Sequence, residues 1–217
     1  MRIRDDFTKP ELVRFDEIAW VESPAPGVER KMLDRIGDEV ARATSFVRYA
    51  PGSNFDPHVH DEGEEFLVLD GTFSDERGDY SKGTYVRNPP GSEHAPRNDD
   101  GCIIFVKLRQ FAPDDSRRCV IPPTMREWLP KAPGVELCPL HGFGRMKVEL
   151  LRLASGSNYE VDTTGGAEAL ILEGRARTAE GDDLPRWSWL RVPDGDDLSL
   201  TGDDDPTLVY LKTRHLP

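Results

Sequence analysis

Hydrophobic residues occur along the chain in short runs rich in Val, Ile, Leu, Phe and Tyr, and Gly, Pro, Asp and Ser separate these runs at close intervals. Short apolar runs between turn-forming residues predict an almost wholly β protein. Helix is expected only in short segments, around Pro10 to Phe15 and Thr124 to Leu129. The pattern suits an antiparallel jelly-roll barrel, which leaves few strand edges exposed and can hold a ligand inside.

The sequence repeats itself in its two halves. Residues 48–55 (RYAPGSNF) return as 152–159 (RLASGSNY), and residues 63–71 (GEEFLVLDG) return as 166–174 (GAEALILEG). Shorter echoes link further segments, namely 25–29 with 132–136, 89–91 with 193–195 and 105–108 with 209–212. Repetition at this scale implies two copies of one barrel. We place the boundary near 111–118, where the strand pattern is broken.

Two short motifs in the first copy contain residue types that bind metal ions. Side chains two residues apart on a strand point the same way, so His58 and His60 can present two imidazoles to one point. Glu64 can add a carboxylate from the returning strand, and His94, just after Pro89-Pro90-Gly91, can add a third imidazole from a distant strand. Three imidazoles and one carboxylate predict a site for one divalent ion per chain: Zn, Fe, Mn, Ni or Cu.

The second copy lacks these ligand types. In an alignment of the two copies, the four positions hold, in order, Asp162, Thr164, Ala167 and Leu198. Leucine cannot coordinate a metal, and its presence indicates a packed or apolar interior. We therefore expect no metal in the second copy and a structural or partner-binding role for it. A pocket for a non-metal ligand is the alternative.

Residues around the predicted ligands suggest what surrounds them. Glu65 has the opposite strand parity from Glu64 and is expected to face outward, whereas Phe66 and Val68 should line the barrel with Glu64. Arg48 recurs in the metal-free copy, which favours a structural role over substrate binding. Three further residues are weaker candidates for contact with a substrate: Tyr85, Arg87 and Lys107.

Three sequence segments in and beside the predicted site resemble the ChrR-like cupins of the cupin superfamily. These segments are RYAPG, HVHDEGEEFLVLDG and RNPPGSEHAP. That family is known from the C-terminal domain of ChrR-type anti-sigma factors, which restrain a sigma factor until oxidative stress, notably singlet oxygen, relieves the inhibition. The chain is also similar to the wider group that contains acetylacetone and dihydroxyacetophenone dioxygenases. The resemblance extends over nearly the whole chain and implies a bicupin, with a metal-binding barrel at 1–112 and a degenerate barrel at 113–217.

Two functions follow from this resemblance. The first is a stress-sensing or regulatory binding module; the second is a non-haem Fe(II) dioxygenase that cleaves a carbon–carbon bond beside a carbonyl. ChrR-type regulators hold their sigma factor through a separate helical zinc domain with a Cys-X-X-Cys arrangement, and this sequence contains no such motif. Four protein ligands leave open positions on a five- or six-coordinate metal, so ligand number does not separate the two functions. The binding role is slightly favoured.

Composition narrows the set of partners. The net charge of −12 opposes a surface that follows nucleic-acid phosphates. Acidic clusters at 182–183, 196–197 and 203–205 lack the alternating Asp and terminal Glu of a calcium loop and are predicted to be solvated turns. A small-molecule ligand in the N-terminal barrel and a regulatory protein are expected as partners, and the cupin resemblance adds a homodimer.

Cysteine usage and hydrophobicity indicate the compartment. The three cysteines are odd in number and widely spaced, so they form neither a disulfide framework nor a zinc-knuckle pair. The first residues contain no apolar stretch of signal-peptide length, and no apolar run approaches the length of a membrane span. A cytoplasmic location without membrane contact is therefore expected.

Overall fold

The computed structural model describes residues 1–204 and 206–217, so Asp205 of the acidic cluster at 203–205 lies outside the described residues. All strand pairs described are antiparallel, and helix is limited there to two short 3-10 turns, η1 (Phe15–Glu17) and η2 (Pro123–Met125). The all-β prediction is confirmed. No helix in the described part is long and apolar enough to cross a membrane.

The chain divides into two compact units. Unit 1 comprises Met1–Asp5 and Ala19–Met125, and unit 2 comprises Asp6–Ile18 and Arg126–Pro217. The predicted boundary after residue 112 therefore lies inside unit 1. Residues 119–121 remain in unit 1 because they pair with the strand at 85–88. Such a pairing joins segments far apart in sequence, and local hydrophobic pattern does not reveal it.

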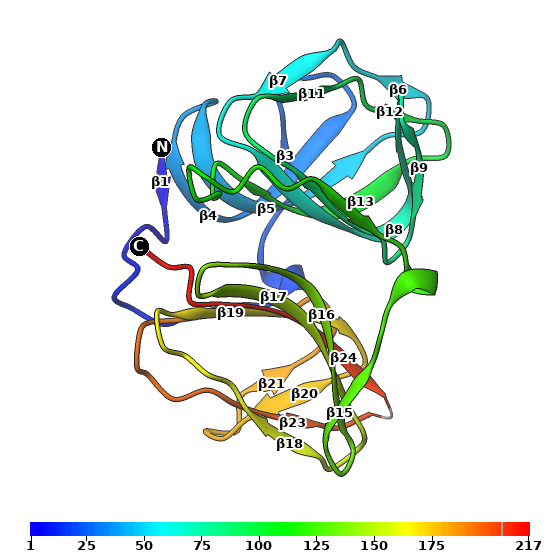
Figure 1. Ribbon diagram of the computed structural model, residues 1–217. Coiled ribbons are helices and arrows are strands. Elements are labelled where there is room, and N and C mark those ends of the chain that lie inside the picture. Colours follow the sequence, from blue (N-terminus) through cyan, green and yellow to red (C-terminus); the bar gives the residue numbers. More distant parts are fainter. Residues whose placement is uncertain (205) are drawn as a thin grey trace. The chain divides into compact units, whose positions relative to one another are not determined.

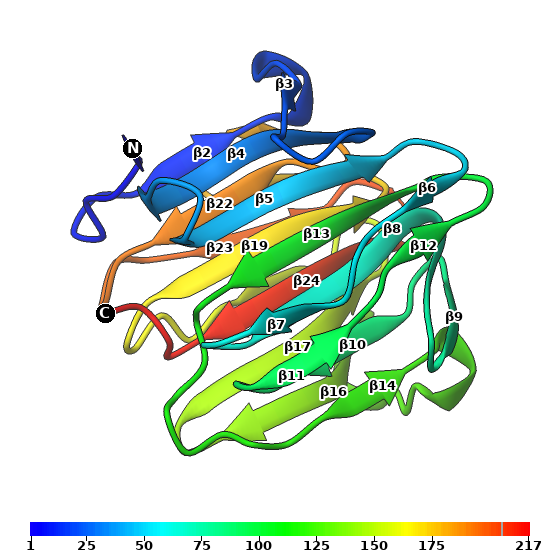
Figure 2. The same cartoon turned by 90° about the horizontal axis from the view of Figure 1, so that it is seen from above.

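The main sheet of unit 1 runs in the order β1-β4-β5-β13-β8-β10-β14 (Figures 1 and 2). Its strands are β1 (Arg2–Ile3), β4 (Val28–Gly37), β5 (Ala41–Tyr49), β13 (Cys102–Leu108), β8 (Glu64–Asp75), β10 (Tyr85–Asn88) and β14 (Cys119–Ile121). Short strands join it at its margins: β3 (Val21–Glu22), β6 (Ser53–Asn54), β9 (Gly78–Ser81) and β12 (Arg97–Asn98). A separate two-stranded sheet pairs β7 (His58–His60) with β11 (Ser92–His94).

The core of unit 1 forms on one face of this sheet. Phe66 and Val68 of β8 are buried there with Val86 of β10 and Ile104 of β13. Phe66 pairs with Val86 and Val68 with Ile104, which places the four side chains on the same side. The prediction that Phe66 and Val68 share an inward face with Glu64 is confirmed.

The opposite face of β8 is also buried, so the expected surface position of Glu65 is wrong. The Glu65 carboxylate accepts hydrogen bonds from the Arg87 guanidinium and from the Tyr85 hydroxyl, the latter at 3.1 Å. Arg87 also donates to Asp115 at 2.5 Å. The parity argument was correct, but this face is covered, and its charges are tolerated because they are paired. Lys107 is directly opposite Glu65 in the sheet, so all three weaker substrate candidates point away from Glu64.

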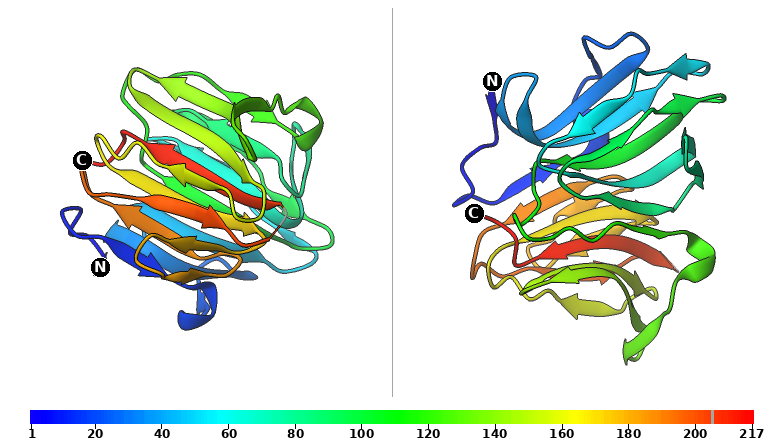
Figure 3. Two further views of the ribbon diagram at one scale, coloured as in Figure 1. Left: turned by 90° about the horizontal axis from the view of Figure 1, so that it is seen from below. Right: turned by 45° about the horizontal axis from the view of Figure 1, so that its top comes forward.

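Unit 2 contains a seven-stranded sheet in the order β15-β16-β17-β24-β19-β22-β2 (Figure 3). Its strands are β15 (Leu129–Ala132), β16 (Val135–Phe143), β17 (Met146–Leu153), β24 (Thr207–Thr213), β19 (Ala167–Glu173), β22 (Trp189–Val192) and β2 (Glu11–Val13). A four-stranded sheet consists of β18 (Asn158–Glu160), β23 (Ser199–Gly202), β20 (Ala176–Thr178) and β21 (Asp183–Leu184). Aliphatic side chains of both sheets form one core.

Strand β2 corrects the helix expected at Pro10 to Phe15. Leu12 pairs with Leu190 and Val13 with Trp189, which adds this N-terminal segment to the edge of β22. Val13 is buried by this pairing. The second expected helix, Thr124 to Leu129, is reduced to η2, and β15 already begins at Leu129. Tertiary pairing overrides weak helical propensity in both places.

One surface arrangement is repeated in both units. Arg48 forms an ion pair of 2.5 Å with Glu29, and its guanidinium lies 4.5 Å from the ring centroid of Trp20. In unit 2, Arg152 forms a 2.9 Å ion pair with Glu136 and stacks 3.7 Å from the ring of Trp128. The contacts of Arg48 are therefore those of a packing residue, in agreement with its recurrence in the sequence.

Candidate metal centre

Antiparallel pairing of β7 with β11 brings the three predicted histidine ligands together. His94 stands directly opposite His58 in this pair, and Ser92 stands opposite His60. The ligand nitrogens of His58, His60 and His94 all lie within 4.8 Å of one another, and the Nε2 atoms of His60 and His94 are 2.9 Å apart. Three imidazoles from two strands thus converge on one point.

Glu64, the first residue of β8, reaches the same point. Its Oε2 lies 3.5 Å from His60 Nε2 and 3.6 Å from His94 Nε2. Asn88 pairs with Glu64 across β8 and β10, and its side-chain amide donates to the same oxygen at 3.2 Å. Glu64 therefore lies beside His60 and His94, whereas the group whose ligand atoms all lie within 4.8 Å of one another contains the three histidines alone. Asn88 was not predicted, although its place opposite Glu64 follows once the sheet register is known.

Burial changes steeply across the cluster. Glu64 and His94 are buried, at 5% and 3% exposure, whereas His60 is partly buried and His58 is exposed. Phe73 forms part of the apolar wall, and its ring centroid is 5.9 Å from that of His94. The cluster is thus anchored in the core of unit 1 on one side and accessible to solvent on the other.

Asp75, at the end of β8, contacts Nδ1 of His94, the ring nitrogen that faces away from the other histidines. The Asp75 Oδ2 is 3.4 Å from His94 Nδ1. Its Oδ1 accepts hydrogen bonds from the Tyr80 hydroxyl at 3.0 Å and from the backbone N–H of Arg77 at 2.8 Å. With Nδ1 engaged, Nε2 of His94 is directed at the centre of the cluster, the arrangement in which a carboxylate fixes a ligating imidazole.

The contact of Asp75 with His94 could not be predicted from the sequence, because regular strand alternation places Asp75 on the same face as Glu65. The pairing of β13 with β8 shifts between Ile103 and Ile104, which are opposite Asp70 and Val68. Leu69 is therefore an extra residue in β8, and such a bulge reverses the facing of every later residue. Asp75 consequently shares the inward face with Glu64. No pattern in the sequence indicates the bulge.

Electrostatics differ between the two inner histidines. Burial lowers the pKa of His60, which favours the neutral imidazole that binds metal. Burial also opposes protonation of His94, but the hydrogen bond to Asp75 and the negative charge of Glu64 outweigh it and raise the pKa of His94. The pKa of Asp75 is lowered: burial raises it, and hydrogen bonds from His94, Arg77 and Tyr80 outweigh that effect. The buried side of the cluster thus favours a positive charge.

The equivalent place in unit 2 corrects the sequence alignment by one residue. The backbone N–H of Gly63 donates to the carbonyl of His60 at 3.1 Å, and that of Gly166 donates to the carbonyl of Thr163 at 2.8 Å. Thr163, and not Thr164, therefore corresponds to His60. Likewise Val161, whose N–H donates to the Leu198 carbonyl at 2.9 Å, takes the place opposite Leu198 that His58 takes opposite His94. The matching segments are 104 residues apart at 48–55 and 103 apart at 63–71, so the second copy has lost one residue, and this loss falls before this strand.

Side chains at the unit 2 positions are unsuited to metal binding. Val161, Ala167 and Leu198 are buried in the core of unit 2. Asp162, expected from the alignment at the ligand position, is exposed and forms an ion pair with Arg214. Among the described residues, the His58, His60 and His94 group is the one set of His, Cys, Asp or Glu side chains close enough to share an ion. The other two histidines, His141 and His215, stand outside it.

Comparison with known families gives one match. Residues 8–112 match the family model of the ChrR cupin-like domain. The resemblance stated from the motifs is confirmed over this range. No curated protein matches the sequence.

Solved structures resemble the chain over nearly its full length at low sequence identity. A Nostoc punctiforme protein, provisionally described as a dioxygenase, has a TM-score of 0.77 at 15% identity and covers 96% of this chain and 84% of its own. The Escherichia coli pirin YhhW, in complex with nickel(II), has a TM-score of 0.69 at 13% identity, with coverages of 94% and 99%. A Bacillus subtilis oxalate decarboxylase variant has a TM-score of 0.65 at 12% identity, with coverages of 94% and 76%. These similarities establish the fold.

Proposed function

We propose that unit 1 binds one divalent metal ion through His58, His60, Glu64 and His94. The observation that carries this proposal is the convergence of the three imidazoles within 4.8 Å, with the Glu64 carboxylate 3.5 Å from His60 and 3.6 Å from His94. Neutral imidazoles are borderline ligands and a carboxylate is a hard one, and the mixed set suits Zn, Fe, Mn or Ni. Without an ion, two imidazole nitrogens and the Glu64 carboxylate would lie this close together at the partly buried end of a sheet.

The environment of the four residues fits a bound ion. Asp75 fixes the orientation of His94, and Asn88 does the same for Glu64, so two of the four side chains are already held in place. A ligand set held in advance loses little conformational entropy when the ion binds. The nickel(II) complex of the structurally similar pirin is consistent with this proposal.

The favoured role is a sensing or regulatory binding module. The ChrR cupin-like match supports it, and so does the exposure of His58, which lets the ion or a small ligand bound to it exchange with solvent. Occupancy of the site would order β7 and β11, whose pairing is only three residues long, and would alter the surface that they present to a partner protein. Unit 2 would then serve as a structural or partner-binding element.

A second candidate function is an Fe(II)-dependent dioxygenase, and the open side of the site favours it. Catalytic metal sites keep a coordination position for substrate, whereas structural sites are closed. The partly buried His60 and the exposed His58 leave such an approach, while Phe66 and Phe73 supply apolar walls. An iron ion there would activate O₂ and the carbonyl group of the substrate. The protein residues would position a chelating substrate and exclude water from the inner side.

The repeat suggests that each unit is one cupin barrel of the jelly-roll type. The two main sheets share the order of their central strands, β5-β13-β8-β10 in unit 1 and β17-β24-β19-β22 in unit 2. Each unit also has short strands, β6 with β12 and β18 with β23, that follow the same pairing. This proposal makes the protein a bicupin in which one barrel has retained metal ligands.

Elemental analysis of anaerobically purified protein tests the metal proposal. We expect about one ion per chain in the wild type and less than about one tenth of that in the His60→Ala variant. The matched control is Val59→Ala, because Val59 lies between the histidines on β7 and is exposed. Equal metal content in His60→Ala and wild type would disprove the site.

Oxygen consumption separates the two roles. With Fe(II) loaded and a β-dicarbonyl such as acetylacetone added, the sensing role predicts no substrate-dependent uptake of O₂. Sustained uptake that disappears in His94→Ala protein would instead establish the enzyme. Because zinc can displace iron, protein that contains zinc is first reloaded with Fe(II). If the reloaded protein still takes up no O₂, the result supports the sensing role.

A further inference from the structure

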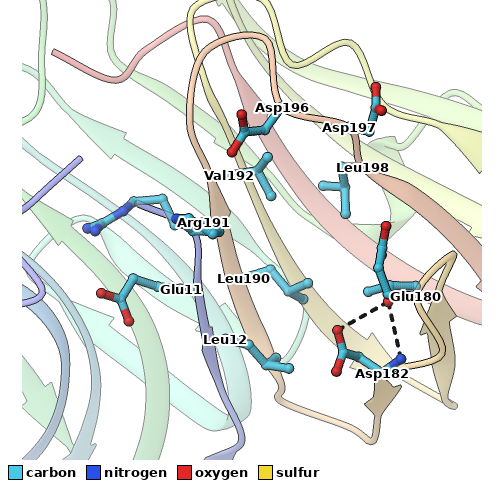
Figure 4. Close-up of a pocket in the computed structure, with 12 residues that line it drawn as sticks. Glu11, Leu12, Glu180, Asp182, Leu190, Arg191, Val192, Asp196, Asp197 and Leu198 are labelled. Atoms are coloured by element: carbon cyan, nitrogen blue, oxygen red, sulfur yellow. Dashed lines mark hydrogen bonds between the residues drawn. The ribbon is translucent and has the colours of Figure 1, made fainter. Parts of the chain in front are cut away.

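Unit 2 contains a cavity of about 500 Å³ that has no part in the metal site (Figure 4). Its floor consists of aliphatic side chains from three segments, namely Leu12, Leu190, Val192 and Leu198. Leu198 corresponds to His94 of unit 1, so the cavity borders the place where unit 2 lacks its metal ligands. Cavities of this size hold small organic ligands in proteins.

Strand pairing explains why the floor is apolar. Leu12 and Leu190 are directly paired between β2 and β22, so both side chains point to the same face. Glu11 and Arg191 form the next pair, on the opposite face, and Figure 4 shows the Arg191 guanidinium pointing away from the leucines. That guanidinium stacks 4.3 Å from the ring of Phe7 and donates to the Asp6 carbonyl at 3.1 Å. Arg191 is the one basic residue that lines the cavity, and its charge points away from the apolar floor.

The rim of the cavity is acidic. Four exposed carboxylates surround it, from Glu180, Asp182, Asp196 and Asp197. Asp182 is held by the Thr178 hydroxyl, which donates to it at 3.3 Å and accepts from its backbone N–H at 3.2 Å. Within the described part of the chain, none of these four carboxylates forms an ion pair with Lys or Arg. The rim therefore carries uncompensated negative charge over an apolar floor.

These carboxylates are too dispersed for a metal ion. No three acidic or histidine side chains in the described part of unit 2 lie close enough to share an ion. A dispersed negative rim instead suits a cation whose charge stays at the solvent boundary while its apolar body enters the cavity. Burial of that body contributes roughly 25 cal/mol per Å² of apolar surface removed from water, and the rim selects for positive charge.

We propose that the unit 2 cavity binds an organic cation, an amine with an aromatic or aliphatic body. The apolar part contacts Leu12, Leu190, Val192 and Leu198, and the ammonium group lies near Asp182, Asp196 and Asp197. This site is independent of the metal proposal for unit 1. It gives the copy without metal ligands a binding role of its own.

Titration calorimetry with three indole probes tests the proposal. Tryptamine, tryptophol and indole-3-acetate share the ring system and differ mainly in charge: positive, neutral and negative. We expect one tryptamine per chain, bound about tenfold more tightly than tryptophol, and no measurable binding of indole-3-acetate. Binding of tryptamine should weaken as salt is added, because the rim charges are exposed. Equal affinity for tryptamine and tryptophol, or no binding of tryptamine, would overturn the proposal.

Charge-matched variants locate the site. Asp196→Asn with Asp197→Asn should weaken tryptamine binding about three- to tenfold, since these side chains are exposed and screened. The control pair, Asp99→Asn with Asp100→Asn, removes the same charge from an exposed turn of unit 1 and should have no effect. Equal weakening by both pairs would mean attraction by the net charge alone and would refute a site in unit 2. Binding that disappears in His94→Ala protein would likewise refute it and place the amine at the unit 1 cluster.

Discussion

Units 1 and 2 have the same central strands and repeat the same Arg–Glu–Trp surface contact, yet they differ completely at one end. Where unit 1 has His58, His60, Glu64 and His94, unit 2 has Val161, Thr163, Ala167 and Leu198. The backbone hydrogen bonds at this end are nevertheless preserved, as the bonds from Gly63 and Gly166 show. The strand arrangement is therefore carried by backbone pairing and the hydrophobic core, and the four ligand-type side chains of unit 1 are an addition to it.

The difference also shows how each unit uses this end. Unit 1 keeps two buried polar side chains, Glu64 and His94, and provides hydrogen-bond partners for both. Unit 2 fills the same positions with side chains that join its core, and an apolar cavity adjoins them. Buried polar groups cost stability unless they are paired, so loss of metal binding is expected to favour apolar replacements.

The largest effect is expected from the same truncation made in both units. His94→Ala should remove the bound metal with a modest change in the stability of the metal-free protein. Leu198→Ala should leave metal content unchanged and destabilise unit 2 by about 2–5 kcal/mol, the usual cost of removing a buried leucine side chain. Elemental analysis and chemical denaturation measure the two effects. A similar loss of metal in both variants would end the distinction between the units.

Metal removal should affect unit 1 alone. An ion present at about 100–1,000 times its dissociation constant stabilises the folded state by about 2.7–4.1 kcal/mol, and a chelator removes this contribution. Hydrogen exchange can assign the loss to strands. We expect faster exchange in β7, β8 and β11 after chelation and unchanged exchange in β18, β19 and β23. Faster exchange in both sets would indicate a second ion in unit 2.

Substitution of Asp75 should weaken metal binding without abolishing it. Asp75→Asn removes the negative charge that orients His94, and loss of such a partner typically lowers metal affinity about 10- to 100-fold. Competition with a chromophoric chelator measures the affinity. The control is Asp79→Asn, since Asp79 is an exposed neighbour that pairs with Arg97 at 3.0 Å. Affinity equal to that of wild type in Asp75→Asn protein would assign Asp75 a role in folding only.

The smallest effects should be equal in the two units. Arg48→Ala and Arg152→Ala each remove one exposed ion pair and one stacking contact on tryptophan. Each should cost about 1 kcal/mol or less, because exposed ion pairs and cation–π contacts contribute little. Thermal denaturation with metal present measures both. A clear loss of metal in Arg48→Ala alone would reveal a link between Arg48 and the site that its contacts do not suggest.

Much of the site could be predicted because its signal is local. His58 and His60 are two residues apart on a strand, and that spacing alone places both imidazoles on one side. The facing of Phe66 and Val68 followed from the same alternation. Asp75 and Asn88 could not be predicted, because one depends on a bulge at Leu69 and the other on the register between β8 and β10.

The errors have one physical origin. Glu65 was expected at the surface and is buried with Arg87, Tyr85 and Asp115. Alternation gives the direction of a side chain but not what covers it. The segment of strand β2 was expected to be helical, and its strand form depends on pairing with a strand far away in the chain.

By itself, the sequence determined the all-β class, the repeat, the four ligand-type residues and the loss of those ligands in the second half. These features depend on residue type and short-range spacing, which strand geometry converts directly into direction. Only the tertiary structure decided which side chains meet: the hydrogen bond of Asp75 to His94, the one-residue shift to Val161 and Thr163, and the acidic rim above Leu198. Each depends on sheet register or on a bulge, and a single extra residue in a strand reverses the facing of all that follow.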